Sequence, residues 1–340
     1  MTAPPFPGRL DQADLSLPER PLVSIVIPTQ NNERHIAPLL DSLDVQTYGP
    51  ESLEIYVVDS ESTDRTLQIV KAFPSRFARL DLIDSPGRDP AVGMNQAMRG
   101  AIGHCWLVID ASGDVDPDFV EQSVSALRRT AAACVGGAVE TIGEGFVGSA
   151  IAAAVASPFG AGASAVHEVF DEEDVDTVSF GCYHRKVWDL VGEFEDAAGE
   201  DGYAARVLQA GGRIVHVPGI RGSYYPSQTF DALARQYFRL GAAKGAAFSS
   251  GRVTQPRDFI PSAALIGAPL LFLLSRRFKP ARWAARAAGS VYFSKGFKAA
   301  GMAAEGRGAN TLVTFAAMVT MQVTYGAGFI KGAVMGRLRR

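Results

Sequence analysis

The sequence is poor in the residues that build metal clusters and disulfide frameworks. It has three cysteines, none of them in a CxxC pair, and five histidines without HxxxH spacing. Scattered cysteines are typical of buried free thiols in a reducing compartment, and the histidine spacing argues against a zinc site. Residues 1–20 also lack the apolar stretch of a signal peptide. We therefore expect a flexible segment at 1–20, followed by a cytoplasmic domain.

The chain also lacks a large net charge, but residues 1–257 and residues 258–340 differ strongly in their charge. The formal net charge is -3 over 340 residues. Residues 1–257 carry 21 Lys and Arg against 34 Asp and Glu, whereas residues 258–340 carry 12 against 2. A basic, apolar tail is typical of contact with anionic lipid or nucleic acid. Because the basic residues flank apolar runs and are not interleaved with stacking aromatics, we expect an anionic membrane surface and no nucleic acid.

Apolar runs typical of buried strands alternate with segments of helical period in the first half of the chain. We expect strands at 23–27, 55–58, 80–83 and 106–109, with helices at 36–43, 67–73, 91–98 and 117–129. Such alternation predicts an α/β fold, a mostly parallel sheet with helices on both faces. Further along, we expect strands at 175–180 and 214–217, and helices at 186–191, 201–209 and 233–244.

Two acids terminate apolar strands: Asp59 closes IYVVD and Asp110 closes WLVID. Ligands of open parallel sheets bind at the carboxyl ends of the strands, so both side chains should reach one crevice. Asp110 also opens a run of clustered acids, whose mutual repulsion a magnesium or manganese ion would relieve. The alternative interpretation of this run is a solvated acidic loop.

The order of several motifs resembles a known family. VSIVIPTQNNE, VVDSESTDRT and VIDASGDVDPDF, in this order, resemble a family 2 glycosyltransferase of the GT-A fold. VDTVSFGCYHRKVWDLVGEF, AGGRIVHVPGIRGSYYP and LARQYFRLG narrow the resemblance to the membrane-associated branch that builds succinoglycan-type exopolysaccharides. The resemblance covers residues 21–250.

The resemblance implies roles for individual residues. It implies contacts with the donor nucleotide by Pro28, Thr29, Glu33, Asp59 and Asp110. It implies divalent metal binding at Asp110 and Ser112, the DxD positions, and diphosphate contacts by Gln236 and Arg239. Glu200 and Asp201 match the ED motif, in which Asp201 is the expected general base. Gly181 and Cys182 lie where the family lines its acceptor site, although a small buried residue is an equal interpretation of Cys182.

Three departures from the family pattern bear on these roles. Ser112 stands where the DxD motif has its second acid, which removes an anionic metal ligand, and Asp114 or Asp116 could substitute for it. The segment after Glu200 and Asp201 is about one residue shorter than the corresponding segment of the family pattern. Leu240 replaces the Trp of processive synthases, which favours addition of one sugar per encounter.

The resemblance implies an inverting hexosyltransferase that uses a nucleotide-diphosphate sugar, preferably a UDP-sugar. The expected acceptor is a glycan or polyprenyl-linked sugar in exopolysaccharide or cell-envelope synthesis. The alternative is a catalytically impaired, nucleotide-sugar-binding or scaffold relative in a polysaccharide assembly complex. A dinucleotide-dependent oxidoreductase is disfavoured, because the turn after the first strand, PTQNNE, has no glycine.

The tail contains two uncharged apolar segments, 259–275 and 308–330, flanked by arginines and lysines. If the first crossed a membrane alone, the following basic residues would lie outside, against the positive-inside tendency. We expect interfacial helices or a re-entrant hairpin on the cytoplasmic face of the cell membrane, with a soluble dimerisation tail as the alternative. The expected domains are 21–250, divided at residue 137 into nucleotide-binding and acceptor-binding halves, and the tail 251–340. The sequence leaves the oligomeric state open.

Overall fold

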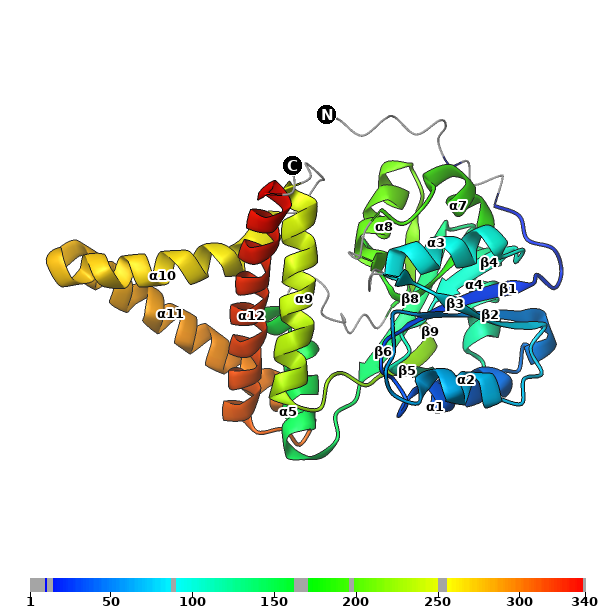
Figure 1. The fold of residues 1–340 in the computed structure, drawn as a ribbon, viewed down its shortest axis with the longest axis horizontal. Helices are drawn as coiled ribbons and strands as arrows, with labels where there is room; N and C mark the ends of the chain where they lie inside the picture. Colours follow the sequence, from blue (N-terminus) through cyan, green and yellow to red (C-terminus); the bar gives the residue numbers. More distant parts are fainter. Residues whose placement is uncertain are drawn as a thin grey trace. The chain divides into compact units, whose positions relative to one another are not determined.

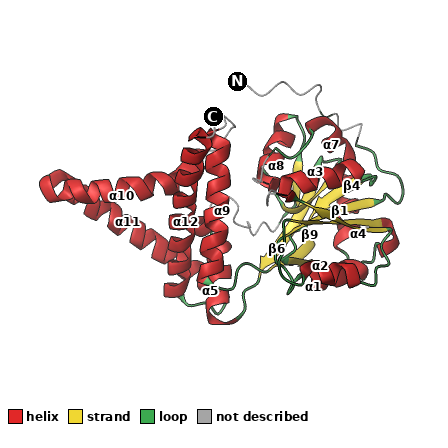
Figure 2. Cartoon of the chain, viewed as in Figure 1, coloured by secondary structure: helices red, strands yellow, loops and turns green. Residues whose placement is uncertain are grey.

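The computed structural model describes residue 10 and residues 15–86, 90–161, 171–195, 199–249 and 256–338. The chain divides into two compact units, whose folds are drawn in Figures 1 and 2. The sheet unit comprises Thr2–Glu140 and Val166–Tyr224, and the helical unit comprises Thr141–Ala165 and Tyr225–Arg340. Residues 141–161 and 225–249, which we expected in the acceptor-binding half, belong to the helical unit, where α5 and α9 pack with the tail helices.

The sheet unit is built on one mixed sheet. Among the described residues its strands run in the order β3-β2-β1-β4-β8-β6-β9-β5, and β7 pairs with β9. Strands β1 to β4 are parallel to one another, whereas β8 is antiparallel to both β4 and β6, and β9 is antiparallel to β5 and β7. The α/β class is therefore confirmed, with the parallel arrangement confined to the first half.

The strand bounds are as follows: β1 Val23–Thr29, β2 Leu53–Asp59, β3 Arg79–Asp84, β4 Cys105–Val108, β5 Gly113–Val115, β6 Cys134–Thr141, β7 Glu173–Asp174, β8 Ser179–His184 and β9 Ile214–Tyr224. The helices of the sheet unit are α1 Ile36–Asp44, α2 Thr66–Ala72, α3 Pro90–Gly100, α4 Phe119–Thr130, α7 Arg185–Val191 and α8 Gly199–Gln209.

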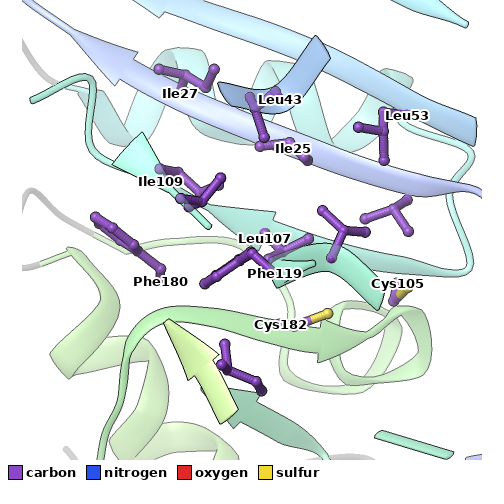
Figure 3. Packing of buried hydrophobic residues seen from close by; sticks show 14 of the residues in the cluster. Ile25, Ile27, Leu43, Leu53, Cys105, Leu107, Ile109, Phe119, Phe180 and Cys182 are labelled. Atoms are coloured by element: carbon purple, nitrogen blue, oxygen red, sulfur yellow. The ribbon is translucent and has the colours of Figure 1, made fainter. Parts of the chain in front are cut away.

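The sheet has a hydrophobic core on each face, because apolar side chains of one strand alternate between the two sides. In β1, Ile25 and Ile27 pack with α1 and α4, whereas Val26 packs on the opposite side with α3, α7 and α8. Figure 3 shows part of the first core, where Phe119 of α4 lies beside Leu107 of β4. Apolar burial on both faces leaves few polar positions in the central strands, and the buried Ser24 of β1 donates to the buried Glu54 of β2 at 2.7 Å.

The sequence misplaced one strand and missed another. The strand expected at 175–180 lies instead at Ser179–His184, in the middle of the sheet between β4 and β6. Its residues from Phe180 to His184 are buried on both faces, so the alternation expected at 175–180 is not its signature. Strand β6 was missed because it contains Gly136 and Gly137. A Cβ at Gly137 would collide with the backbone oxygen of Ile220, so the close approach of β9 requires glycine.

The helical unit consists of α5 Gly145–Val155, α6 Pro158–Ala161, α9 Phe230–Ser249, α10 Ile260–Arg277, α11 Lys279–Ala304 and α12 Thr311–Leu338. Its core lies where α12 meets α5, α9 and α11, around Leu233, Phe315 and Met318. Helix α5 ends at Val155 and packs inside this core through Ile151 and Ala154.

Helices α9 and α12 approach each other closely through glycines on both partners. A Cβ at Gly241 or Gly245 would lie 2.1 Å from a backbone oxygen of α12, and one at Gly328 or Gly332 would lie 2.1 or 2.0 Å from a backbone oxygen of α9. Real Cβ atoms do not come so near, so any larger residue would push the helices apart. We name these four residues the glycine contact.

Two of the described helices are long and apolar enough to cross a membrane, judged by length and composition alone. They are Ile260–Arg277, of which 11% of the window is buried, and Thr311–Arg337, of which 39% is buried. The second is also the central packing helix of its unit, so its apolar character is explained in part by that core. The first has few such contacts.

Candidate active site

Asp59 and Thr29 lie at the carboxyl ends of neighbouring parallel strands. They are paired in register on β2 and β1, and each is 3% exposed. The Asp59 Oδ2 accepts a hydrogen bond from the Ser62 backbone at 2.9 Å. The Oδ1 is buried and finds no partner among the described residues. A buried carboxylate oxygen without a donor is costly, so it is a candidate for binding an N–H group of a ligand.

The loops that follow β1 and β2 are fastened to each other. The Asn31 side chain accepts from the Thr63 backbone at 2.8 Å, and the Asn31 backbone donates to the Ser62 hydroxyl at 2.8 Å. Asn31 and Glu61 both adopt the left-handed region, with φ of 55° and 60°. Non-glycine residues rarely occupy this region outside sites where the surroundings enforce it. The loops around Asp59 are therefore held in one conformation by their mutual hydrogen bonds.

Glu33 also connects the two loops. Its Oε2 accepts from the backbone and the side chain of Arg65, at 3.0 and 3.3 Å, just before α2. Its own backbone donates to Asp64 at 3.1 Å. The structure thus gives Glu33 a role in holding the two loops together, and its expected contact with the nucleotide stays a prediction.

Asp110 follows β4, the neighbour of β1 on its other side. Its Oδ1 accepts from the Ser112 backbone at 2.7 Å, which folds the segment into a tight turn. The residue is exposed to water. Surrounding protein nevertheless desolvates the carboxylate and raises its pKa, while the hydrogen bond from the Ser112 backbone and the charge of His35 offset part of this effect. A carboxylate both crowded and reached by water suits a ligand-binding role.

A chain of side-chain hydrogen bonds joins the two strand ends. The Ser112 hydroxyl donates to Asn32 at 3.1 Å, and the Asn32 amide donates to the Thr29 hydroxyl at 3.3 Å. The structure therefore brings Thr29, Asp59, Asp110 and Ser112 to one edge of the sheet, together with Pro28 of β1. Asn32, which links them, was not singled out from the sequence.

The side chains at this edge that could coordinate a metal fit a divalent ion only if a bound diphosphate supplies most of the oxygen ligands. Among the described residues, no group of three or more His, Cys, Asp or Glu lies together to hold an ion. Asp110 is a carboxylate at this edge that water reaches, whereas the Ser112 hydroxyl donates its hydrogen to Asn32. Asp114 lies in β5, paired with Ser223 of β9. Magnesium and manganese bound to diphosphate use few protein carboxylates, so Asp110 suffices as an anchor.

Gly181 and Cys182 lie inside β8. Cys182 is fully buried in the core, in register with Leu107 of β4, and burial raises the pKa of its thiol. A Cβ at Gly181 would be 2.9 Å from the Tyr183 ring, so this position is tightly packed. The structure gives both residues packing positions, which was the alternative interpretation of Cys182.

The remaining predicted residues lie on two helices. Glu200 and Asp201 fall in the first turn of α8, but their side chains lie outside the described part of the chain. Gln236 and Arg239 lie on α9 in the helical unit, where the Ser227 hydroxyl donates to Gln236 at 2.9 Å. Their roles stay predictions.

Helix α8 is held by contacts that the sequence did not suggest. The buried Asn95 of α3 donates to the Phe194 carbonyl and accepts from the Phe194 backbone N–H, each at 2.9 Å. Arg206 of α8 donates to the carbonyls of Val191 and Glu193. The Tyr203 ring packs edge-on against Trp106, with centroids 5.4 Å apart. Residues 191–194, before α8, are therefore held by side chains of both α3 and α8.

We expect Asn95→Ala to lower the free energy of unfolding by about 2–4 kcal/mol, because it leaves two buried backbone groups of Phe194 unpaired. Turnover should fall as well, since the entry to α8 loosens. Urea denaturation and steady-state kinetics measure the two effects. Gln96→Ala, one residue further on the exposed face of α3, serves as the control. Equal stability of the two variants would contradict the assignment.

The fold and this edge define a class of protein. A sheet with a parallel first half, acids at the carboxyl ends of β2 and β4, and an antiparallel second half is the GT-A architecture of nucleotide-diphospho-sugar transferases. Residues 24–188 match the family described as Glycosyl transferase family 2. The chain therefore carries a family 2 domain and is a glycosyltransferase.

Several known proteins are similar to this chain. It is 25% identical over 243 residues to the dolichyl N-acetyl-alpha-D-glucosaminyl phosphate 3-beta-D-2,3-diacetamido-2,3-dideoxy-beta-D-glucuronosyltransferase of Methanococcus voltae, covering 67% of this chain and 74% of that relative. It is 27% identical to the succinoglycan biosynthesis protein ExoA of Rhizobium meliloti, covering 73% and 76%. The mannosyltransferase PcManGT from Pyrobaculum calidifontis, solved with GDP-Man and Mn2+, aligns with a TM-score of 0.53 at 20% identity, over 96% of this chain and 90% of that one. This last likeness concerns the fold alone.

Proposed function

We propose that this glycosyltransferase moves a sugar from a nucleotide-diphosphate sugar, preferably a UDP-sugar, to a hydroxyl of a lipid-linked glycan, with inversion at the anomeric carbon. The observation that carries the donor part is the buried, unpartnered Oδ1 of Asp59 beside Thr29. Uracil and guanine both present a ring N–H that such an oxygen accepts. The names of the Methanococcus and Rhizobium relatives support a lipid-linked acceptor and exopolysaccharide synthesis.

The donor diphosphate belongs next to Asp110 in this proposal. A magnesium or manganese ion, when bound, supplies positive charge that stabilises the leaving diphosphate. Asp110 anchors that ion through its carboxylate, and Ser112 with Asn32 keeps the turn in place. Asp201 removes the proton of the acceptor hydroxyl, while Gln236 and Arg239 contact the diphosphate. The reaction takes place at the cytoplasmic face of the cell membrane.

The donor site is tested by Asp59→Asn. The substitution keeps the shape but removes the charge-assisted acceptor, so UDP should bind about 10–100-fold more weakly. Isothermal titration calorimetry with UDP and manganese measures the affinity. Asp41→Asn, an exposed acid on α1, is the control and should bind as the parent does. Unchanged affinity of the Asp59 variant would remove the main support for this donor site.

The second candidate is a catalytically impaired relative that binds nucleotide sugars in an assembly complex. It is favoured by Ser112 at the DxD position, whose hydroxyl donates to Asn32. Donor hydrolysis separates the two candidates. Slow, metal-dependent release of nucleoside diphosphate supports the enzyme, and binding without any release supports the scaffold.

A further inference from the structure

Helices α10 and α11 form a hairpin of the helical unit that exposes apolar side chains along its length. The helices run antiparallel with Phe278 between them, and Figure 1 shows the hairpin extending from α9 and α12. In the described helix Ile260–Arg277, Ser262 is the one buried residue. Large side chains on both helices are more than half exposed: Ile266, Leu270, Phe272, Leu273, Trp283 and Phe293. Soluble monomers rarely leave so much contiguous apolar surface in water.

The charge of the hairpin has one sign. Residues 259–304 contain seven Lys and Arg and no Asp or Glu. Two of the arginines lie over aromatic rings: Arg276 is 5.2 Å from the Phe272 centroid, and Arg286 is 5.8 Å from that of Trp283. Paired aromatic and basic side chains are enriched where membrane proteins meet the lipid headgroups. The surface is therefore complementary to an anionic bilayer, whereas a second copy of the hairpin would repel it.

The spacing of the charges excludes a hairpin that crosses the bilayer. Helix α10 is about 27 Å long at 1.5 Å per residue, close to the hydrocarbon thickness of about 30 Å. Helix α11 would have to cross beside it, yet its longest uncharged run between basic residues, 287–294, spans only about 12 Å. Lysines and arginines on both sides of this run would then lie in hydrocarbon. A hairpin lying along the membrane plane leaves them at the headgroups.

We propose that the α10–α11 hairpin lies in the interface of an anionic membrane, with its apolar side chains at the boundary of the acyl chains and Arg276, Arg277, Lys279, Arg282 and Arg286 at the lipid phosphates. The inference rests on the membrane location proposed above, but not on the transfer reaction. It assigns the membrane attachment to this hairpin and places the hairpin at the depth of the lipid headgroups.

Vesicle flotation of the full-length protein tests the attachment. The protein should float with vesicles of phosphatidylcholine and phosphatidylglycerol and much less with phosphatidylcholine alone. Arg276→Gln combined with Arg282→Gln should weaken flotation about tenfold or more, because each basic residue near the surface contributes separately. Arg20→Gln combined with Lys71→Gln, which removes two exposed charges of the sheet unit, should change nothing. Unaltered flotation of the hairpin variant overturns the assignment to the hairpin. Absence of any flotation overturns the membrane location as well, while leaving the transfer reaction to the donor-binding test.

The fluorescence of Trp283 tests the depth. Trp106 and Trp188 are 1% and 8% exposed, whereas Trp283 is 70% exposed, so a blue shift on vesicle addition reports Trp283. Trp283→Phe should abolish that shift. Lipids brominated close to the headgroup should quench Trp283 more strongly than lipids brominated near the end of the chain. Stronger quenching from the bilayer centre would overturn the interfacial placement in favour of a span.

Discussion

Asp201→Asn is expected to lower kcat by about 10²–10⁴ while leaving donor affinity intact, because an acceptor hydroxyl needs a positioned base to lose its proton. Asp201 falls in the first turn of α8, the helix that Asn95 and Arg206 hold through the segment before it. Single-turnover assays with a nucleotide sugar and an acceptor measure the rate, and calorimetry measures the donor affinity.

Glu200→Gln is the matched control for this prediction. Since the segment after the pair is about one residue short of the family pattern, the base function belongs either to Asp201 or to its neighbour. A large loss of kcat in Glu200→Gln, together with a nearly active Asp201→Asn, would assign the general base to Glu200. Full activity in both variants would contradict a general base on α8.

Asp110→Asn is expected to lower kcat/KM by about 10²–10³, because it removes the carboxylate that anchors the metal beside the diphosphate. The loss should not be recovered at higher manganese concentration if the charge itself is needed. Asp41→Asn, which removes an exposed carboxylate of α1, is the control and should retain activity. Equal activity of the two variants would show that another residue anchors the metal.

The same substitution should make the protein more stable when donor and metal are absent. Desolvation by the surrounding protein raises the pKa of the water-exposed Asp110, so the folded state binds this proton more tightly than the unfolded state does. Stability is therefore lost as the pH rises from the unfolded Asp pKa, about 3.9, through the raised folded pKa. Asn does not ionise, so Asp110→Asn should raise the melting temperature at pH 7 in EDTA and flatten its pH dependence. A lower melting temperature would contradict the desolvated carboxylate.

The parallel half of the fold was predictable because β1, β2 and β4 contain apolar runs and the helices between the strands have apolar stripes. Asp59 and Asp110 followed from the same pattern, since an acid that ends a buried strand is unusual. Ser112 stands at a motif position, but its bond to Asn32 depends on two loops that are 80 residues apart. No local pattern encodes such a contact.

The antiparallel half was harder for a different reason. Strand β6 depends on glycines that admit a neighbouring backbone, and β8 is buried on both faces, so neither has the alternation that marks a strand. Cys182 was ambiguous for the same cause, because a small residue suits both a core and a binding site. Asn95 resembles any polar helix residue until Phe194, 99 positions further on, is brought against it.

The glycine contact between α9 and α12 determines how these two helices can move. A slide of one residue would bring a side chain onto a carbonyl, so only jumps of about one helical turn restore a glycine opposite a backbone oxygen. Helix α9 can therefore occupy only positions along α12 that differ by about one helical turn. Any displacement of Gln236 and Arg239 along the α9 axis has to carry α12 with it, so strain applied to the C-terminal helix would be transmitted to these two side chains without being absorbed on the way.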